Sequence, residues 1–257
     1  MRADYHTHST YSDGRFLWSM CEAAEEVGLD AIGFADHCNV SSRERQQRAK
    51  HALGFNLDIT YERRREAIKG MRERFDIDVY DGVEMDFDSR DIDEISAFLD
   101  EAGFQYAIGS VHHLEAVNVH VEPYFARKSE GERADLVDQF FGEVVALLES
   151  ELFDIAAHVD LVERNPALRG FATDDHYHAV AEAAEQSRTL LELNAGRVLG
   201  EYGELHPNRA FLEVLADYDI EFVLGTDSHE PGEIGERKEE IEKFVTAHGL
   251  ETVELGL

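Results

Sequence analysis

Short apolar runs alternate with longer amphipathic segments along the whole chain. The short runs predict seven β-strands, at residues 2–5, 31–35, 79–83, 106–111, 155–157, 190–193 and 222–224. The amphipathic segments predict seven helices, at residues 17–27, 59–74, 93–101, 132–149, 175–186, 209–218 and 235–247. Regular alternation of strands and helices is typical of an α/β fold with a parallel sheet, and the seven strands fit a barrel.

Three of the predicted helices end at or just before a glycine, namely Gly28, Gly103 and Gly249. Glycine is common there because it adopts the left-handed conformation that turns the chain out of a helix. Two segments interrupt the alternation, at residues 39–55 and 113–131, and long connections of this kind often act as lids or substrate loops. Since no internal repeat or Pro/Ser-rich linker occurs, we expect one domain over residues 1–257.

The chain is strongly acidic, because 55 Asp and Glu residues against 24 Lys and Arg residues give a net charge of −31. This charge repels nucleic acid and anionic lipid, so neither is an expected partner. The acidic residues are spread over all the predicted helices, which favours a solvated surface over a binding tail. Our hypothesis is a halophilic protein, whose like charges are screened by a potassium-rich cytoplasm. Full helicity and an unchanged thermal midpoint in dilute buffer would contradict it.

The cysteine content and the apolar runs indicate where the protein resides. Only Cys21 and Cys38 are present, without the cysteine-rich framework of a small secreted protein. The first residues lack the apolar stretch of a secretory signal, and no apolar run approaches the length of a membrane span. We therefore expect a reduced, cytoplasmic setting without a membrane partner; the sequence indicates no particular oligomeric state.

Histidines and acidic residues gather at the carboxyl ends of the predicted strands. In chain order they are His6, His8, His37, Glu84, His112, His158, Asp227 and His229. In a barrel of parallel strands these ends share one rim, which is where such folds place their active sites. Five other histidines fall on predicted helices and loops, namely His51, His176, His178, His206 and His248. The convergence of the first set predicts a common site.

The residue types in this set indicate a metal centre. His6 and His8 lie two residues apart on an extended strand, so their side chains point the same way and can bind one ion. Imidazole together with carboxylate suits Zn, Mn or Fe, and the lack of thiolate ligands argues against a structural zinc site. One ion cannot use so many ligands, which implies two or three divalent ions that share a bridging carboxylate.

Seven short motifs carry these residues and cover nearly the whole chain. They are HTHSTYSDG (6–14), GFADH (33–37), DGVEMD (81–86), GSVHH (109–113), AAHVDLV (156–162), LELNAG (191–196) and LGTDSHEP (224–231). HTH or TDSH alone would be a weak signal. The ordered set, however, resembles the polymerase and histidinol phosphatase (PHP) family, which implies a distorted (β/α)7 barrel with a trinuclear metal centre.

The resemblance also implies a ligand set for each ion. The first set is His6, His8, Glu84 and Asp227, the second is Glu84, His112 and His158, and the third is Asp13, His37 and His229. Glu84 would be the bridge. Many relatives carry histidine where this chain has Asp13, so the chain departs from the family pattern at the third ion. We expect His113 not to be a ligand, because adjacent strand residues face opposite ways.

Such a centre indicates phosphoester hydrolysis, because metal ions activate water near neutral pH and neutralise phosphoryl oxygens. The proton for the leaving alkoxide would come from a metal-bound water, from Asp227 or from His229, and the sequence leaves these alternatives open. A phosphate monoester also needs a cation. Arg164 and Arg197 follow the fifth and sixth predicted strands on the rim side, where their forked guanidinium groups can bind phosphate oxygens.

Within the family, the chain resembles the histidinol-phosphatase-like branch in its length and in the lack of an attached polymerase module. The LELNAG segment and the insertion after GSVHH also resemble that branch. The resemblance thus implies a metal-dependent phosphomonoesterase that hydrolyses L-histidinol phosphate to L-histidinol and phosphate in histidine biosynthesis. Two alternatives stay open. One is a PHP phosphoesterase for another small ester, such as a nucleotide or sugar phosphate, and the other is a non-catalytic metal-binding regulatory module.

Overall fold

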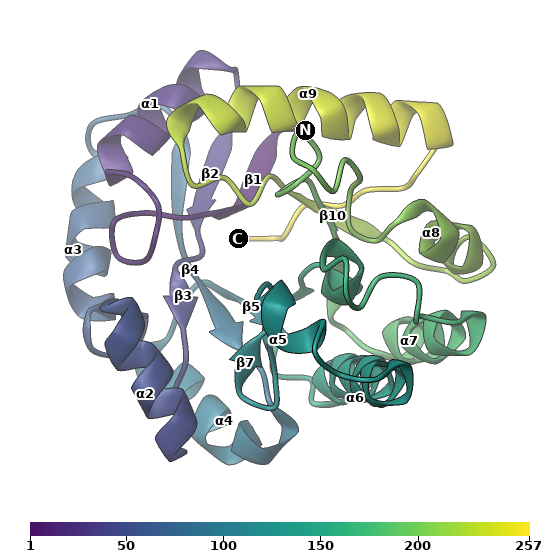
Figure 1. The fold of residues 1–257 in the computed structure, drawn as a ribbon. Coiled ribbons are helices and arrows are strands. Elements are labelled where there is room, and N and C mark those ends of the chain that lie inside the picture. Colours follow the sequence, from purple (N-terminus) through teal and green to yellow (C-terminus); the bar gives the residue numbers. More distant parts are fainter.

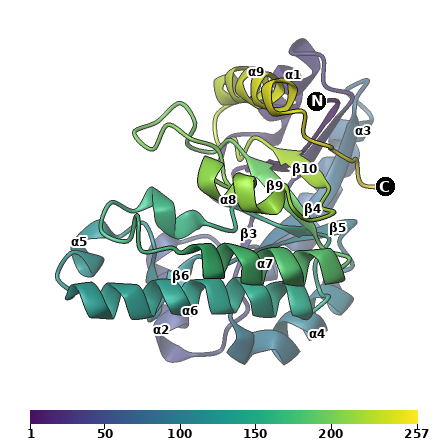
Figure 2. The same ribbon diagram turned by 90° about the vertical axis from the view of Figure 1, so that its right-hand side faces the viewer.

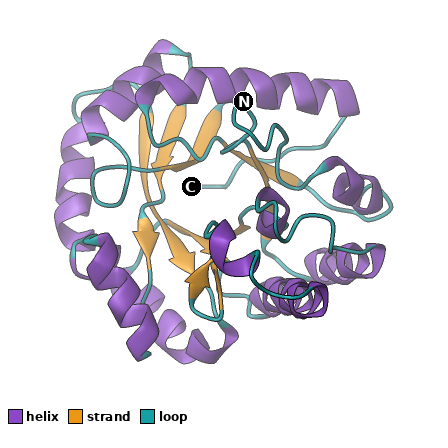
Figure 3. Ribbon diagram, viewed as in Figure 1, coloured by secondary structure: helices purple, strands orange, loops and turns teal.

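Parallel strands form the inner layer of the computed structural model, which describes residues 1–257. In spatial order they are β1 (Ala3–Thr7), β2 (Ala31–Phe34), β4 (Asp78–Asp86), β5 (Tyr106–Ser110), β8 (Ile155–Ala156), β9 (Leu190–Asn194) and β10 (Phe222–Gly225). Each overlaps one of the seven predicted strands. Figure 3 shows these strands inside a ring of helices, so the predicted (β/α)7 barrel is confirmed.

The helices form the outer layer, and each predicted helix is present. They are α1 (Leu17–Glu26), α3 (Tyr61–Arg72), α4 (Ile92–Ala102), α6 (Glu130–Glu149), α7 (Asp174–Gln186), α8 (Arg209–Leu215) and α9 (Pro231–His248) (Figures 1 and 2). Gly28, Gly103 and Gly249 have φ angles of 73°, 59° and 63°, so the predicted left-handed helix ends are confirmed. None of these helices combines the length and the apolar character needed to cross a membrane.

The barrel is nearly closed between its first and last strands. Thr7 and Ser228 form a parallel bridge, and the His8 amide donates to the Ser228 carbonyl oxygen over 2.9 Å. Earlier on β1, the buried carboxylate of Asp4 accepts hydrogen bonds from the backbone amide and the hydroxyl of Thr226, at 3.1 and 2.5 Å. These contacts hold the end of β1 beside the end of β10, although the two strands share no continuous ladder.

Small side chains and tyrosines fill part of the barrel interior. Tyr106 fits there because Gly33 and Gly82 have no Cβ, which would overlap its ring, and its hydroxyl donates to the Tyr5 carbonyl oxygen over 2.5 Å. The C-terminal residues cover the amino end of the barrel, where Thr252 pairs with Phe222 at the start of β10. The carboxyl end is the one left for a functional site.

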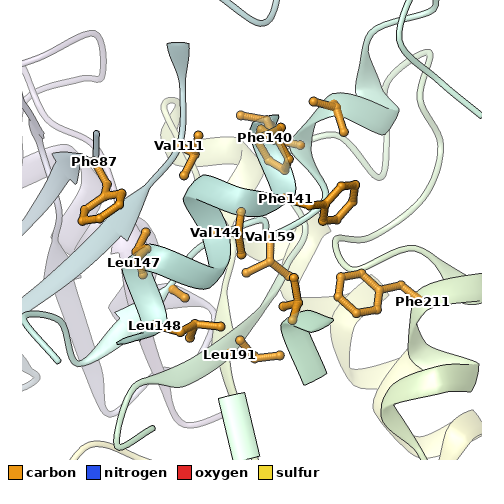
Figure 4. Close-up of a cluster of buried hydrophobic side chains, with 14 of the residues drawn as sticks. Phe87, Val111, Phe140, Phe141, Val144, Leu147, Leu148, Val159, Leu191 and Phe211 are labelled. Atoms are coloured by element: carbon orange, nitrogen blue, oxygen red, sulfur yellow. The ribbon is translucent and has the colours of Figure 1, made fainter. Parts of the chain in front are cut away.

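The larger apolar core lies between the barrel and the helices. It contains 39 buried residues, many of them from α6 and the strands beneath it. Figure 4 shows Phe140, Phe141 and Leu147 of α6 pointing into this cluster. Burial of such side chains stabilises the fold by about 1.5–3 kcal/mol each, so this helix anchors one side of the barrel.

The two segments that interrupt the alternation contain short elements that the sequence pattern did not predict. The first has α2 (Glu44–Leu53), and just before it lies β3 (His37–Cys38), which extends the pairing of β4. The second has β6 (His113–Leu114), β7 (Val117–Asn118) and α5 (Glu122–Phe125). The pattern failed at α2 because this helix is almost wholly polar and buries only Gln46.

A buried network of ion pairs and hydrogen bonds connects α3 with the loop after β1. Arg64 is fully buried, and its guanidinium donates to Asp36 over 2.9 Å and to Asp81 over 2.7 Å. Asp36 in turn accepts from the amide and the hydroxyl of Ser9, both at 2.7 Å. Because Ser9 follows His8, this network fixes the chain segment that carries the first two predicted metal ligands.

We predict that Arg64→Met lowers the free energy of unfolding by about 3–5 kcal/mol, because it leaves the buried Asp36 without its cation and leaves Asp81 with Arg65 alone. Urea denaturation followed by circular dichroism measures the change. Arg63→Met is the matched control, since Arg63 is exposed on the same helix and its replacement should change the free energy by less than about 0.5 kcal/mol. Equal unfolding midpoints for the two variants would contradict a stabilising role of the network.

Candidate metal centre

A cavity of about 440 Å³ opens at the carboxyl end of the barrel. Most of the predicted site residues line it, and α5 and the loop after β9 project from the same end of the molecule (Figure 2). The structure brings together all nine predicted ligands, namely His6, His8, Asp13, His37, Glu84, His112, His158, Asp227 and His229.

Glu84 of β4 lies at the middle of this group and is almost fully buried. Its Oε1 accepts a hydrogen bond from the Ser110 hydroxyl over 2.7 Å. The Nε2 atoms of His158 and His112 lie 3.1 and 3.2 Å from the same oxygen. One side of the carboxylate therefore faces the residues of the second predicted ligand set.

The other carboxylate oxygen of Glu84 faces three further imidazoles. His37 Nδ1 lies 2.7 Å from Oε2, and the Nε2 atoms of His6 and His8 lie 3.5 and 3.6 Å away. Oε2 nevertheless forms no hydrogen bond of acceptable geometry. Nitrogen and oxygen lone pairs that converge on one point without hydrogen bonds are expected around a metal ion. A carboxylate that has other ligands beside both of its oxygens can bridge two such ions.

A local irregularity in β1 puts two consecutive side chains inside the barrel. The register of β1 on β2 shifts between Asp4 and Thr7. Tyr5 packs on Tyr106 with ring centroids 5.8 Å apart, and the next residue, His6, faces the metal centre. His6 and His8 then point to the same side, as predicted from their spacing, with ring centroids 5.2 Å apart.

Asp227 and Asp13 complete the candidate ligands. Asp227 Oδ1 lies 3.3 Å from His8 Nε2, and Asp13 Oδ1 lies 3.3 Å from His229 Nε2 and 3.6 Å from His37 Nε2. Asp227 has a φ angle of 51° and His158 one of 33°. Left-handed backbone at a residue other than glycine costs about 1–3 kcal/mol and is concentrated at functional sites.

Three sets of ligand atoms lie within 4.8 Å of one another. They are His8, Asp13, His37 and His229; His6, His8 and Asp227; and His37, Glu84 and His112. These sets overlap the three predicted ones, but His8 and His37 each belong to two of them and His158 to none. His113 is in no set either, and its Nδ1 lies 3.4 Å from Asp86 Oδ2 instead.

The chemistry of these donors fits divalent metal ions. His6 Nε2, His8 Nε2 and Glu84 Oε2 are buried and have no hydrogen-bond partner in the protein. A buried polar atom without a partner costs about 1–3 kcal/mol. A divalent ion that accepts these lone pairs would remove that cost, and imidazole with carboxylate is a ligand mixture that Zn, Mn and Fe accept.

Burial and neighbouring charges shift the pKa values of the candidate ligands strongly. Burial and the charges of His229 and His37 lower the pKa of His8 to about 4, which keeps its imidazole neutral, as a ligand must be. Burial alone would raise the pKa of Glu84, but the neighbouring imidazolium charges, above all that of His37, lower it well below its usual value. Since ligands must shed protons to bind metal, ions and protons compete for this site.

Two acidic residues that the sequence analysis did not assign orient the imidazoles. Glu192 of β9 lies with Oε1 2.7 Å from His6 Nδ1, and Asp86 Oδ1 lies 2.5 Å from His112 Nδ1. A carboxylate on the outer nitrogen fixes the tautomer and the ring orientation of a metal-ligating histidine. Both residues belong to quoted motifs, LELNAG and DGVEMD, so a signal for them was present in the sequence.

The structure corrects the view of His206 as one of the scattered histidines. His206 is buried, its Nδ1 lies 2.6 Å from Asp160 Oδ1, and its ring centroid lies 6.4 Å from that of His158. Only the tertiary fold brings it there, because it lies in an irregular loop between β9 and α8 that has no periodic pattern.

Arg164 and Arg197, the two predicted phosphate ligands, both line the cavity. The side chain of neither forms a hydrogen bond or an ion pair with the protein. Burial and the charge of Arg197 lower the pKa of Arg164 to about 10, which shows that the two guanidinium groups repel each other. Two unpaired cations in a chain of net charge −31 form a site suited to a dianion.

The PHP domain model matches residues 4–196, which is most of the chain, and the protein therefore belongs to the PHP family. It is 29% identical over 236 residues to a Deinococcus radiodurans protein named "Probable histidinol-phosphatase", with 90% of this chain and 87% of that one covered. The fold is similar to that of histidinol phosphate phosphatase from Lactococcus lactis, whose crystal structure contains Zn, L-histidinol and phosphate. The TM-score is 0.78 at 20% identity, over 98% of this chain and 95% of that one.

We predict that Glu192→Gln weakens metal binding roughly 10- to 100-fold, because His6 loses the charged partner that fixes its tautomer. Competition with a chromophoric chelator measures the affinity, and circular dichroism monitors the fold. Glu201→Gln, an exposed position in the loop after β9, is the control and should bind metal like the wild type. If both variants hold metal equally well, Glu192 does not support the centre.

Proposed function

We propose that this protein is a metal-dependent phosphomonoesterase that hydrolyses L-histidinol phosphate to L-histidinol and phosphate. The observation that carries the proposal is the convergence of five imidazoles on the two oxygens of Glu84, beside two unpaired arginines in one cavity. The names of the Deinococcus and Lactococcus relatives support the choice of ester. The cavity volume of about 440 Å³ suits a small ester of this kind.

Two or three divalent ions, of Zn, Mn or Fe, would be held by the residues at this rim. The proposed sets are His6, His8, Glu84 and Asp227; Glu84, His112 and His158; and Asp13, His37 and His229. The second proposed set has His158 where the set of ligand atoms found within 4.8 Å of one another has His37. His158 Nε2 nevertheless lies 3.1 Å from Glu84 Oε1, the same oxygen that faces His112. When bound, such ions supply Lewis acidity to the phosphoryl oxygens and to the attacking water.

The side chains around the ions then have separate tasks. Arg164 and Arg197 bind the phosphate oxygens and hold the ester in the cavity, since no group of the protein competes for them. The proton for the leaving alkoxide would come from a metal-bound water, from Asp227 or from His229, and both residues line the cavity. No covalent intermediate on the protein is needed, because water attacks phosphorus directly.

Steady-state assays on metal-reconstituted protein test the proposal. We predict that L-histidinol phosphate is hydrolysed with a higher kcat/KM than simple aryl phosphates. Removal of metal by a chelator should abolish turnover, and added Zn or Mn should restore it. Hydrolysis of aryl phosphates but not of L-histidinol phosphate would overturn the proposed substrate. Metal binding without any phosphatase activity would instead favour a regulatory module.

We predict that Arg197→Ala raises KM about 10-fold or more and changes kcat less, because a hydrogen bond to a charged group contributes about 1.5–3 kcal/mol to binding. Initial rates over a range of ester concentrations separate the two constants. Arg188→Ala is the control, since Arg188 is exposed and pairs with Glu151 away from the cavity. A fall in kcat at constant KM would show that Arg197 acts only on the transition state.

A further inference from the structure

One wall of the cavity takes no part in metal or phosphate binding. It is built by α2 and its flanking residues, and Gln46, Lys50 and Phe55 are among the side chains that line it. The ring of Phe55 stacks on that of His37, with centroids 6.2 Å apart and an angle of 19° between the planes. Phe55 of this wall therefore lies next to His37, a candidate metal ligand. The alcohol part of an ester held at the metals would lie along this wall or point toward the mouth of the cavity.

Hydrogen bonds within the protein occupy most polar groups of this wall. The amide of Asn39 donates to Asp86 over 2.8 Å, and the amide of Asn56 donates to the Asn39 carbonyl oxygen over 3.0 Å. Lys50 Nζ donates to that same carbonyl oxygen over 2.8 Å and lies 3.4 Å from Asp58. These groups are not available to a ligand without loss of their present partners.

Gln46 is the exception on this wall. Its side chain is only 3% exposed, its Oε1 is buried without a hydrogen-bond partner, and its amide nitrogen forms no hydrogen bond either. The next residue, Gln47, shows the contrast, since its amide donates to the Ser41 carbonyl oxygen over 2.6 Å. A buried amide without a partner costs about 1–3 kcal/mol, and a ligand that pairs with it recovers that free energy.

We propose that Gln46 and Phe55 form the subsite for the alcohol part of the phosphate ester, and that this part is a planar nitrogen heterocycle with an N–H group, such as imidazole. An amide offers one acceptor and one donor, which matches the donor and acceptor nitrogens of a neutral imidazole. The face of Phe55 offers a flat apolar surface for the ring. This inference rests on the proposed function, because it assigns the part of the substrate that the metals and arginines do not hold.

Gln46→Met tests the subsite, since methionine keeps the length of the side chain and a high helix propensity but removes the amide. We compare kcat/KM for L-histidinol phosphate with kcat/KM for p-nitrophenyl phosphate. The ratio should fall about 10-fold in the variant, mainly through the KM of L-histidinol phosphate, because p-nitrophenol has no N–H group. Gln47→Met, on the same helix but outside the cavity, should leave the ratio unchanged.

A ratio in Gln46→Met equal to that of the wild type would overturn the subsite. Binding of L-histidinol to metal-loaded protein, measured by calorimetry, gives a second readout that needs no turnover. Binding weakened about 10-fold in Gln46→Met supports the subsite, and equal binding overturns it. If the wild type hydrolyses no phosphate ester at all, the proposed function fails, and this binding experiment alone then decides the subsite.

Discussion

The structure depends on one buried carboxylate, that of Glu84, and on the imidazoles packed around it. A buried charge is tolerated only when it is paired or coordinates metal. Five histidines from four other parts of the chain approach its two oxygens, so the fold must bring all of these segments to one point. The barrel does this because the carboxyl ends of its parallel strands meet at one rim. Three buried atoms that could ligate metal, His6 Nε2, His8 Nε2 and Glu84 Oε2, have no hydrogen-bond partner, and bound ions would supply one.

The supports of this centre are themselves charged and buried. Arg64 neutralises Asp36 behind the loop that carries His8, and Asp4 joins the first strand to Thr226 just before Asp227. Glu192 reaches His6 because Gly225 on the neighbouring strand has no Cβ to fill the space that its carboxylate occupies. The metal centre and the closure of the barrel are thus parts of one polar network, and loss of one partner should disturb the geometry of the others.

Charge is distributed unevenly over the molecule in a way that suits an anionic substrate. With a net charge of −31 the chain as a whole repels phosphate esters. The cavity reverses this locally, because Arg164 and Arg197 have no carboxylate partners there, whereas the buried Arg64 pairs with Asp36 and Asp81. The wall built by α2 and its flanking residues is polar but neutral at Gln46 and apolar at Phe55. The cavity therefore combines a cationic part with the part that we propose binds a ring with hydrogen-bonding nitrogens.

The sequence alone determined the seven strands, the seven main helices and the three glycine helix ends, because periodicity and left-handed glycines are local properties of the chain. It also predicted that His6, His8 and Glu84 lie at strand ends on one rim, since parallel strands share their direction. The sequence did not reveal α2, whose polar residues show no apolar face, or the roles of Glu192, Asp86 and His206. Those roles depend on contacts between residues that lie up to 186 positions apart in the sequence. Only the tertiary structure decided them, because which buried donor meets which acceptor depends on how the strands and loops pack in space.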